Sequence, residues 1–382
     1  MPERWRYDDT MKGIERLTIA VVGGGVAGLG VAWRLAQAGC AVTLFDAGQV
    51  PSHNGAATWA SAGMICARLE MVDASPPMAA FALSARAAWP AFAAELDRSA
   101  GMSCGYLERG ALHAFFGRAH APHPGAGVER IDRATALRLE PGLADDVAAA
   151  LWAPGEAQAD PRWLVLALAR ACRAAGVTVR AETRINRLLE AQGRVTGVLT
   201  AEGPANFDHV VVAAGAWTTG LLKVSNLPGP RLRPVKGELL SLAGDRAVMP
   251  VTRLVWTDEC YIVPHGDGRI VVGATQLEAG FDTTLDHERI DALRRSAERA
   301  VPALARLTEL ERVCGFRPAA DDGLPVLGGI GPQGLTLATG QFRNGILFAP
   351  LIADTAAQHT LQGRLPDLAR PFAAARFAEA AA

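Results

Sequence analysis

Three glycines and one aspartate near the N-terminus have the types and the spacing that bind a nucleotide. The pattern G-x-G-x-x-G stands at Gly23, Gly25 and Gly28, directly after the apolar run Ile19–Val22. Gly23 permits a sharp turn, Gly25 lets backbone amides approach a pyrophosphate, and Gly28 lets the following helix pack close to the strand. Asp46 ends a second apolar run and is placed to accept a hydrogen bond from a ribose hydroxyl. The ordered unit of strand, turn, helix and strand predicts a dinucleotide site.

Two other polar side chains stand in apolar surroundings. Arg317 lies in the sequence Gly-Phe-Arg-Pro, where a guanidinium is costly unless it meets an anion, and its planar fork matches a carboxylate. Tyr261 begins an apolar strand, and its hydroxyl could add a second donor to the same anion. The structural alternatives are an internal salt bridge for Arg317 and simple core packing for Tyr261.

Hydrophobic periodicity indicates the elements that must position these residues. The spacing predicts helices over residues 77–99 and 161–175, and a charged surface helix over 286–301. Alternating patterns predict strands at 177–180, 208–213, 260–264 and 269–274. Helices and strands alternate near the start and strands cluster later. We therefore expect a mixed α/β fold, with a Rossmann-like nucleotide-binding domain and a second, mainly antiparallel domain.

The first apolar run has an alternative interpretation as a signal peptide. Basic residues precede the uncharged run 17–33, and Ala38-Gly39-Cys40 weakly resembles a lipoprotein cleavage site. However, Gln37 stands where a branched apolar residue is needed, and three consecutive glycines interrupt the run. The nucleotide-binding unit is therefore the favoured interpretation, and the polar residues 1–16 are expected to form a loose extension.

Composition limits the possible partners and the compartment. The chain has 382 residues, a net charge of −1 and half of its residues apolar, so there is no electrostatic case for nucleic acid or an anionic membrane. No other stretch is long enough to span a membrane. The six cysteines are scattered without a C-x-x-C pair, which argues against a metal site or a disulfide framework. We expect a reducing, cytoplasmic compartment, and a homo-oligomer is left open.

A series of motifs along the chain resembles one family of oxidoreductases. In chain order the motifs are Ala60-Ser61-Ala62-Gly63-Met64, Asp208–Trp217, Pro234–Glu238, Tyr261–Pro264, Val272–Thr275, Gly315–Pro318, Asp322–Pro325 and Gly340–Leu347. This set resembles the FAD-dependent amino-acid and amine oxidoreductases of the D-amino acid oxidase and sarcosine oxidase type. It is most similar to the glycine oxidases of thiamine thiazole synthesis, and the resemblance runs from Leu17 to about Leu361.

The resemblance implies FAD as the cofactor and extends its site beyond the glycine turn. The small residues 60–64 suit a loop beneath the flavin ring, with a purely structural turn as the alternative. A helix starting near Arg343 would direct its positive end to the flavin. The expected cofactor-binding residues are Gly23, Gly25, Val26, Ala27, Gly28, Asp46, Ala60, Ser61, Ala62, Gly63, Met64, Ile185, Ala214, Gly215, Trp217, Arg317, Gly340, Phe342, Arg343, Asn344, Gly345 and Ile346.

The order of these motifs predicts a discontinuous fold. Residues 17–80, 153–222 and 312–366 are expected to build the FAD-binding domain, because the cofactor-type glycine turns fall in three separated blocks. Residues 81–152 and 223–311 are expected to build the substrate-binding domain.

The resemblance also assigns the substrate site. Arg317 would bind the substrate carboxylate, with Tyr261 and Arg343 as catalytic neighbours, although a structural role for Arg343 is equally compatible. Glu259 could recognise an amine-bearing side chain, or could be a solvated strand end. Gln276 is a second pocket candidate; it stands where a glycine oxidase has Met, as Gln341 stands where His is common. These departures weaken the expectation of strict glycine specificity.

The implied reaction is oxidative deamination of glycine or another small amino acid or amine. A hydride passes from Cα to flavin N5, giving an imine and, with O₂, hydrogen peroxide. The alternatives are a D-amino acid or N-methyl amino acid dehydrogenase that passes electrons to a quinone or another acceptor, and a flavoprotein without turnover. Cys314 matches the register of the cysteine that holds flavin covalently in sarcosine oxidase, but non-covalent FAD is the preferred expectation.

Overall fold

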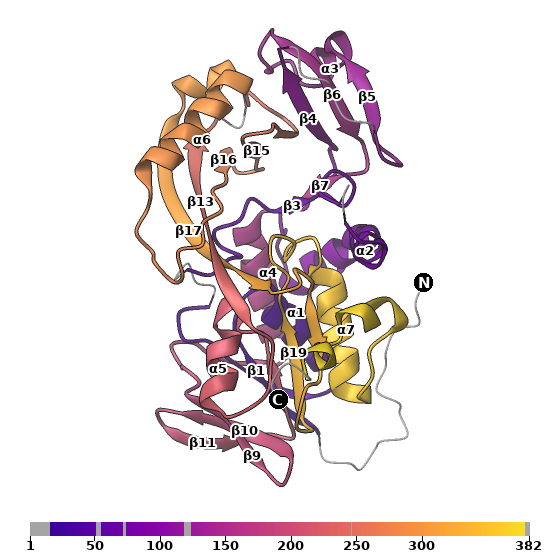
Figure 1. Ribbon diagram of the computed structural model, residues 1–382, viewed down its shortest axis with the longest axis vertical. Coiled ribbons are helices and arrows are strands. Elements are labelled where there is room, and N and C mark those ends of the chain that lie inside the picture. Colours follow the sequence, from indigo (N-terminus) through magenta and orange to yellow (C-terminus); the bar gives the residue numbers. More distant parts are fainter. Residues whose placement is uncertain (1–15, 51–54, 72–73, 118–123, 246, 379–382) are drawn as a thin grey trace.

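A mainly parallel sheet lies at the centre of one half of the molecule (Figure 1). The computed structural model describes residues 16–50, 55–71, 74–117, 124–245 and 247–378. Within them, the strands of this sheet run in the order β18 (Val326–Gly328), β19 (Leu335–Thr339), β12 (His209–Val212), β1 (Thr18–Val22), β2 (Ala41–Phe45) and β8 (Thr178–Arg180). All neighbours are parallel except β18 and β19. Except for the exposed edge strand β8, the strands are largely buried and rich in Val, Ile and Leu, as parallel strands covered on both faces must be.

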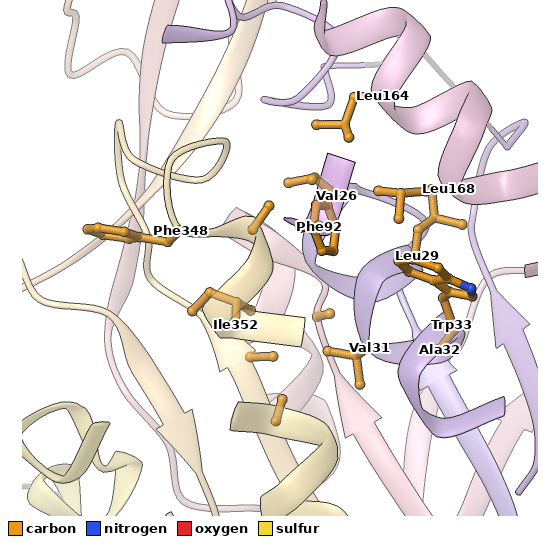
Figure 2. Close-up of a cluster of buried hydrophobic side chains, with 14 of the residues drawn as sticks. Val26, Leu29, Val31, Ala32, Trp33, Phe92, Leu164, Leu168, Phe348 and Ile352 are labelled. Atoms are coloured by element: carbon orange, nitrogen blue, oxygen red, sulfur yellow. The ribbon is translucent and has the colours of Figure 1, made fainter. Parts of the chain in front are cut away.

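Helix α1 (Val26–Gln37) connects β1 to β2 and is the most enclosed helix of this half. It packs against α4 (Pro161–Ala174) and α7 (Ala349–Gln362), and α2 (Pro76–Ala100) packs against those two helices. Figure 2 shows the shared core, with Val26, Leu29, Val31, Ala32 and Trp33 of α1, Phe92 of α2, Leu164 and Leu168 of α4, and Phe348 and Ile352 around the start of α7. Each large apolar side chain buried in this way contributes about 1.5–3 kcal/mol.

A long, mainly antiparallel sheet forms the other half (Figure 1). Its order is β17 (Thr308–Ala320), β13 (Leu232–Ala243), β16 (Arg269–Gly273), β15 (Tyr261–Pro264), β14 (Leu254–Trp256), β4 (Ala111–Phe116), β6 (Val147–Ala153) and β5 (Glu129–Asp132). Only β14 and β4 pair in parallel among the described residues. Helices α6 (His287–Ala300) and α3 (Arg133–Leu139) contribute to its core. The Asp286 carboxylate begins α6 by accepting the Arg289 backbone N–H at 3.1 Å.

Several shorter elements lie outside the two large sheets and their helices. Strands β9 (Arg187–Ala191), β10 (Arg194–Thr200) and β11 (Gly203–Asn206) form an antiparallel sheet at the end of the molecule opposite α6 (Figure 1). Strands β3 (Met64–Ile65) and β7 (Ala157–Gln158) pair with each other, and α5 (Thr218–Val224) follows β12.

One buried carboxylate ties the two halves together. Asp160 begins α4 by accepting the backbone N–H groups of Arg162 and Trp163 at 2.9 and 3.2 Å. The same carboxylate forms an ion pair with Arg269 of β16, in the antiparallel sheet. The side chain of Asp160 is only 3% exposed, so this contact is shielded from water.

The structure confirms the mixed α/β class and the antiparallel second sheet. The helices expected over 77–99, 161–175 and 286–301 correspond to α2, α4 and α6, and the four expected strands correspond to β8, β12, β15 and β16. The division into domains stays a prediction, and four of its boundaries fall inside elements. Residue 80 lies in α2, which packs in the α1 core, and the boundaries after residues 152, 222 and 311 lie in β6, α5 and β17. The expected N-terminal extension lies, except for Arg16, outside the described residues.

Candidate active site

A single elongated cavity joins the glycine turn to the antiparallel sheet. Its volume is about 840 Å³, within the range of cofactor and ligand pockets. The parallel-sheet side contributes the turn after β1, the end of β2 and the segment after β12. The other side contributes residues of β15, β16 and β17. The cavity therefore brings together groups that are up to about three hundred residues apart in the chain.

The glycine turn has the geometry that its spacing predicts. Gly23 has a φ of +111°, and a Cβ there would lie 2.4 Å from the Ala213 carbonyl oxygen. A Cβ on Gly28 would lie 1.9 Å from the Gly23 carbonyl oxygen, so both glycines are required by the packing. Gly25 is different, because a Cβ would meet only Thr58 Oγ1, at 3.6 Å. A side chain at position 25 would thus enter the cavity without damaging the fold.

Asp46 lines the cavity at the end of β2. Its Oδ2 accepts the Gly24 N–H at 2.6 Å, and its Oδ1 accepts the Gly48 N–H at 2.8 Å. These bonds fix the carboxylate against the glycine turn. An ionised carboxylate has about four acceptor positions, so Asp46 keeps the capacity to accept a ribose hydroxyl.

The loop of small residues lies between the two halves. Ala60, Ser61, Ala62, Gly63 and Met64 all line the cavity. A glycine in β17 allows the loop to approach this closely, because a Cβ on Gly315 would lie 2.8 Å from the Ala60 Cβ. The loop is therefore positioned by a close contact with the strand that carries Arg317.

Arg317 projects from β17 into the far end of the cavity. It donates to the Thr275 carbonyl oxygen at 3.0 Å, and burial lowers the pKa of its guanidinium. Within the described part of the chain no carboxylate forms an ion pair with it. Across the sheet, a Cβ on Gly237 would lie 2.3 Å from an Arg317 guanidinium nitrogen. Because Gly237 of β13 has no side chain, the Arg317 guanidinium can lie directly over its backbone.

The side chain of Tyr261 also lies over a glycine, on the neighbouring strands β15 and β16. It pairs with Gly273 in the β15–β16 ladder, and a Cβ on Gly273 would lie 2.5 Å from the tyrosine hydroxyl. Burial raises the pKa of Tyr261, and the positive charge of Arg317 opposes that rise. The phenol is therefore neutral near pH 7 and can donate a hydrogen bond beside the guanidinium.

Arg343 also lines the cavity, but it does not begin a helix as expected. Residues 341–348 are wound in turns, in which the Asn344 N–H donates to the Gln341 carbonyl and the Phe348 N–H to the Asn344 carbonyl. Helix α7 begins only at Ala349, because Pro350 in its first turn has no N–H to satisfy. Arg343 is exposed, and its guanidinium lies 5.8 Å from the centre of the Phe342 ring.

Glu259 and Gln276 lie at the mouth of the cavity. Both also line an adjoining groove along α6, which includes Arg289, Arg295 and Arg299. The Glu259 carboxylate binds Arg299 and the Ser296 hydroxyl, so it is directed toward α6. Its side chain is 61% exposed, which matches the solvated strand end that was the alternative interpretation.

Most of the other expected residues line the cavity, and three do not. The cavity-lining set includes Val26, Ala27, Ile185, Ala214, Gly215, Trp217, Phe342, Gly345 and Ile346. Gly28, Gly340 and Asn344 lie outside it, although Gly28 holds the turn as described above. Cys314 also lies outside the lining, and its thiol donates to the Thr283 carbonyl oxygen at 3.6 Å.

The sequence did not identify Glu70, a charged residue of the cavity lining. Glu70 follows the small-residue loop and β3, and it shares the cavity with Arg317 and Arg343. The pattern around it, Ala67-Arg68-Leu69-Glu70, has no motif spacing. The roles of Gly237 and Gly273 were also missed, although glycine inside a strand is itself a sign of close approach.

These features define an FAD-dependent oxidoreductase, and the chain belongs to that family: the family model described as "DAO: FAD dependent oxidoreductase" matches residues 18–359. Among curated relatives, a glycine oxidase of Bacillus licheniformis is 32% identical over 354 residues, which cover 91% of this chain and 94% of the relative. A bifunctional protein ThiO/ThiG of Synechocystis is 33% identical over 369 residues. That match covers 94% of this chain but 54% of the relative, so the chain spans about half of the bifunctional protein's length.

A solved structure shows the same fold. The crystal structure of glycine oxidase from Geobacillus kaustophilus matches with a TM-score of 0.83 and 29% identity, over 94% of this chain and 99% of that one. Within the described residues, no helix is long and apolar enough to span a membrane, and no cluster of His, Cys, Asp or Glu is arranged to hold a metal ion.

Proposed function

We propose that the chain catalyses the FAD-dependent oxidative deamination of glycine or another small amino acid or amine to an imine. The observation that carries this proposal is the position of Arg317. Its guanidinium lies at one end of a cavity whose other end is the glycine turn, and it has a neutral phenol beside it. A bidentate pair with a carboxylate is the interaction that such a guanidinium favours.

The residues at the other end fit FAD. The open face of Gly25 and the positive end of α1 suit the pyrophosphate, and Asp46 suits the ribose. The loop 60–64 and Gly345 suit the flavin end. When bound, FAD supplies a flavin N5 that accepts a hydride from the substrate Cα. We propose that FAD is held non-covalently, since the thiol of Cys314 is directed to Thr283 and not to the cavity.

The protein groups then act mainly by orientation. Arg317 and Tyr261 would hold the carboxylate, which fixes the position of the Cα–H toward the flavin end of the cavity. The loop 60–64 and the buried residues Gly315 and Phe316 of β17 would keep water from that contact. Arg343, at the exposed edge, would add positive charge that stabilises a bound carboxylate.

Oxygen is the proposed electron acceptor, with hydrogen peroxide as the second product. The support is that the relatives covered along most of their length are named oxidases. A contribution of the imine to thiamine thiazole synthesis and a cytoplasmic location are part of the same proposal, as they were expected from the sequence.

Anaerobic titration tests the proposal. Glycine, sarcosine and a panel of D-amino acids should be added to the yellow protein without oxygen, and at least one should bleach the flavin absorbance. Air should then restore the colour and produce peroxide. Reduction of dyes without peroxide would instead indicate a dehydrogenase, and a flavin that no amine bleaches would refute the proposed activity.

A further inference from the structure

The substrate end of the cavity contains an unequal set of charges. Apart from Asp258 and Glu259 at the mouth, which pair with His113 and Arg299, two guanidinium groups, Arg317 and Arg343, and one carboxyl group, Glu70, line it. Arg317 donates to a backbone carbonyl and Arg343 lies over an aromatic ring. Among the described residues, none of these three side chains takes part in an ion pair, so their charges are directed at the cavity.

Glu70 is held in place by a second, fully buried carboxylate. Glu156 accepts the backbone N–H groups of Ala67, Arg68 and Leu69, at 3.0, 2.5 and 3.2 Å. These three bonds fix the turn that leads into Glu70. Pairing of β3 with β7 fixes the chain on the other side of that turn. The carboxyl group of Glu70 is therefore presented to the cavity by an anchored segment of backbone.

This arrangement is complementary to a zwitterion. A substrate carboxylate placed on Arg317 leaves one cation, Arg343, and one carboxyl, Glu70, to interact with the rest of the ligand. An ammonium or amine group can donate to Glu70, whereas a carboxylate that lacks an amine offers it no donor. We propose that Glu70 binds the amino nitrogen of the substrate and makes the cavity selective for amino acids over carboxylates that lack an amine. The inference rests on the proposed function, whose site it completes.

The electrostatics of the site support this role. Burial raises the pKa of Glu70 to about 7, Arg343 lowers it, Glu156 raises it and Arg317 lowers it. Tyr261, the other titratable group that faces Glu70, is neutral in this range. A bound ammonium favours the ionised carboxyl, and a bound carboxylate favours the protonated one. Binding of acetate to the oxidised protein should therefore weaken as pH rises through about 7.

The decisive experiment compares two ligands on Glu70→Gln. Acetate binding is measured from its perturbation of the flavin spectrum at pH 8. Glycine binding is measured from the glycine concentration that gives half of the maximal rate of anaerobic flavin reduction. Removal of the negative charge should tighten acetate binding about tenfold, because a like-charge repulsion is lost. It should raise the half-saturating glycine concentration about tenfold, because one charge-assisted contact is lost. The acetate affinity of the variant should also lose its dependence on pH.

Glu278→Gln is the matched control. It removes the same charge from the nearby loop, but Glu278 pairs with Arg233 and is 61% exposed. Both ligands should bind it as they bind the wild type.

Opposite shifts for the two ligands support the inference, and shifts of the same sign overturn it, because a carboxyl that only neutralises the arginines would affect every carboxylate alike. If Glu70→Gln fails to retain FAD, the wild-type acetate profile decides: a flat profile between pH 6 and about 8 overturns the inference. If the wild type oxidises no amine, the proposed function fails. In that case the ability of glycine to displace acetate, measured from the flavin spectrum of the wild type and of Glu70→Gln, still tests whether Glu70 binds the amino nitrogen.

Discussion

The two ends of the cavity are lined by different kinds of groups: mainly backbone at the cofactor end, and mainly polar side chains at the substrate end. The cofactor end consists largely of backbone and small residues, with Gly23, Gly24 and Gly25 following one another in a single turn. The substrate end consists of side chains from separate strands and loops, including Tyr261, Arg317 and Glu70. A short segment can define a backbone site, whereas a side-chain site depends on the pairing of distant strands. We therefore expect FAD binding to be lost when a side chain is added at the cofactor end. We expect turnover to be lost when a charge is removed at the substrate end.

The largest effect should come from filling the cofactor end. Gly25→Val places a branched side chain in the cavity where only Thr58 Oγ1 lies near, so the fold should survive while FAD binding weakens by about a hundredfold or more. The flavin content of the purified protein and the circular dichroism spectrum of the apoprotein measure the two properties. Gly155→Val, at a glycine that also has open space around it, is the control and should remain yellow. A yellow Gly25→Val protein would contradict this account of the turn.

At the substrate end, removal of Arg317 should leave the cofactor end intact. Arg317→Ala should retain the FAD spectrum but lose about a hundredfold in kcat/KM for amino acids, because a bidentate contact worth on the order of 3 kcal/mol is absent. Arg317→Lys should recover only part of this loss.

Arg312→Ala is the matched control for Arg317, on the same strand. Its guanidinium pairs with Glu309 and Asp291 outside the cavity, so kcat/KM should be unchanged. Near wild-type oxidation of glycine or sarcosine by Arg317→Ala would show that the substrate end has been misassigned.

A smaller loss of kcat/KM is expected when a methyl group is added at Gly237, beside the Arg317 guanidinium. Gly237→Ala puts a methyl group 2.3 Å from the guanidinium, which must move, and kcat/KM should fall about tenfold with FAD retained. Kinetics of the double variant with Arg317→Ala provide the test. Once the guanidinium is gone, the methyl group should have almost no further effect on kcat/KM. Additive losses would mean that Gly237 matters for some other reason.

The smallest effect is expected at the mouth of the cavity. Glu259→Gln should change kcat/KM for glycine, and for a diamino acid, by less than about twofold, because the carboxylate already binds Arg299 and Ser296 in an exposed pair. Steady-state kinetics with both substrates measure this. A selective loss for the diamino acid would restore Glu259 as a recognition residue.

The contrast between the ends also explains what the sequence could predict. The glycine turn, α1 and Asp46 are local in the chain, so their spacing predicts their geometry. Arg317 and Tyr261 were predicted from an unusual residue in apolar surroundings together with a family resemblance. Both line the cavity, and their roles stay predictions that the tests above check.

Other features depend on contacts that no local pattern encodes. The space for Arg317 depends on the β13–β17 ladder, in which Gly237 faces Gly315 from a distant part of the chain. Glu70 depends on backbone bonds to Glu156, which lies more than eighty residues later. The late start of α7 is the exception, because Pro350 was visible in the sequence and marks the first turn of a helix.

The carboxylate of Asp160 has a consequence for how the molecule melts. It caps a helix of one half and pairs with Arg269 of the other, and it is almost completely buried. If the antiparallel half came apart alone, Asp160 would keep its bonds at the start of α4 but lose Arg269, and a buried charge left without its partner costs about 3–5 kcal/mol. That penalty lowers the population of forms in which only the antiparallel sheet is unfolded. Heat should therefore unfold the parallel and antiparallel sheets in one cooperative transition, despite their separate cores.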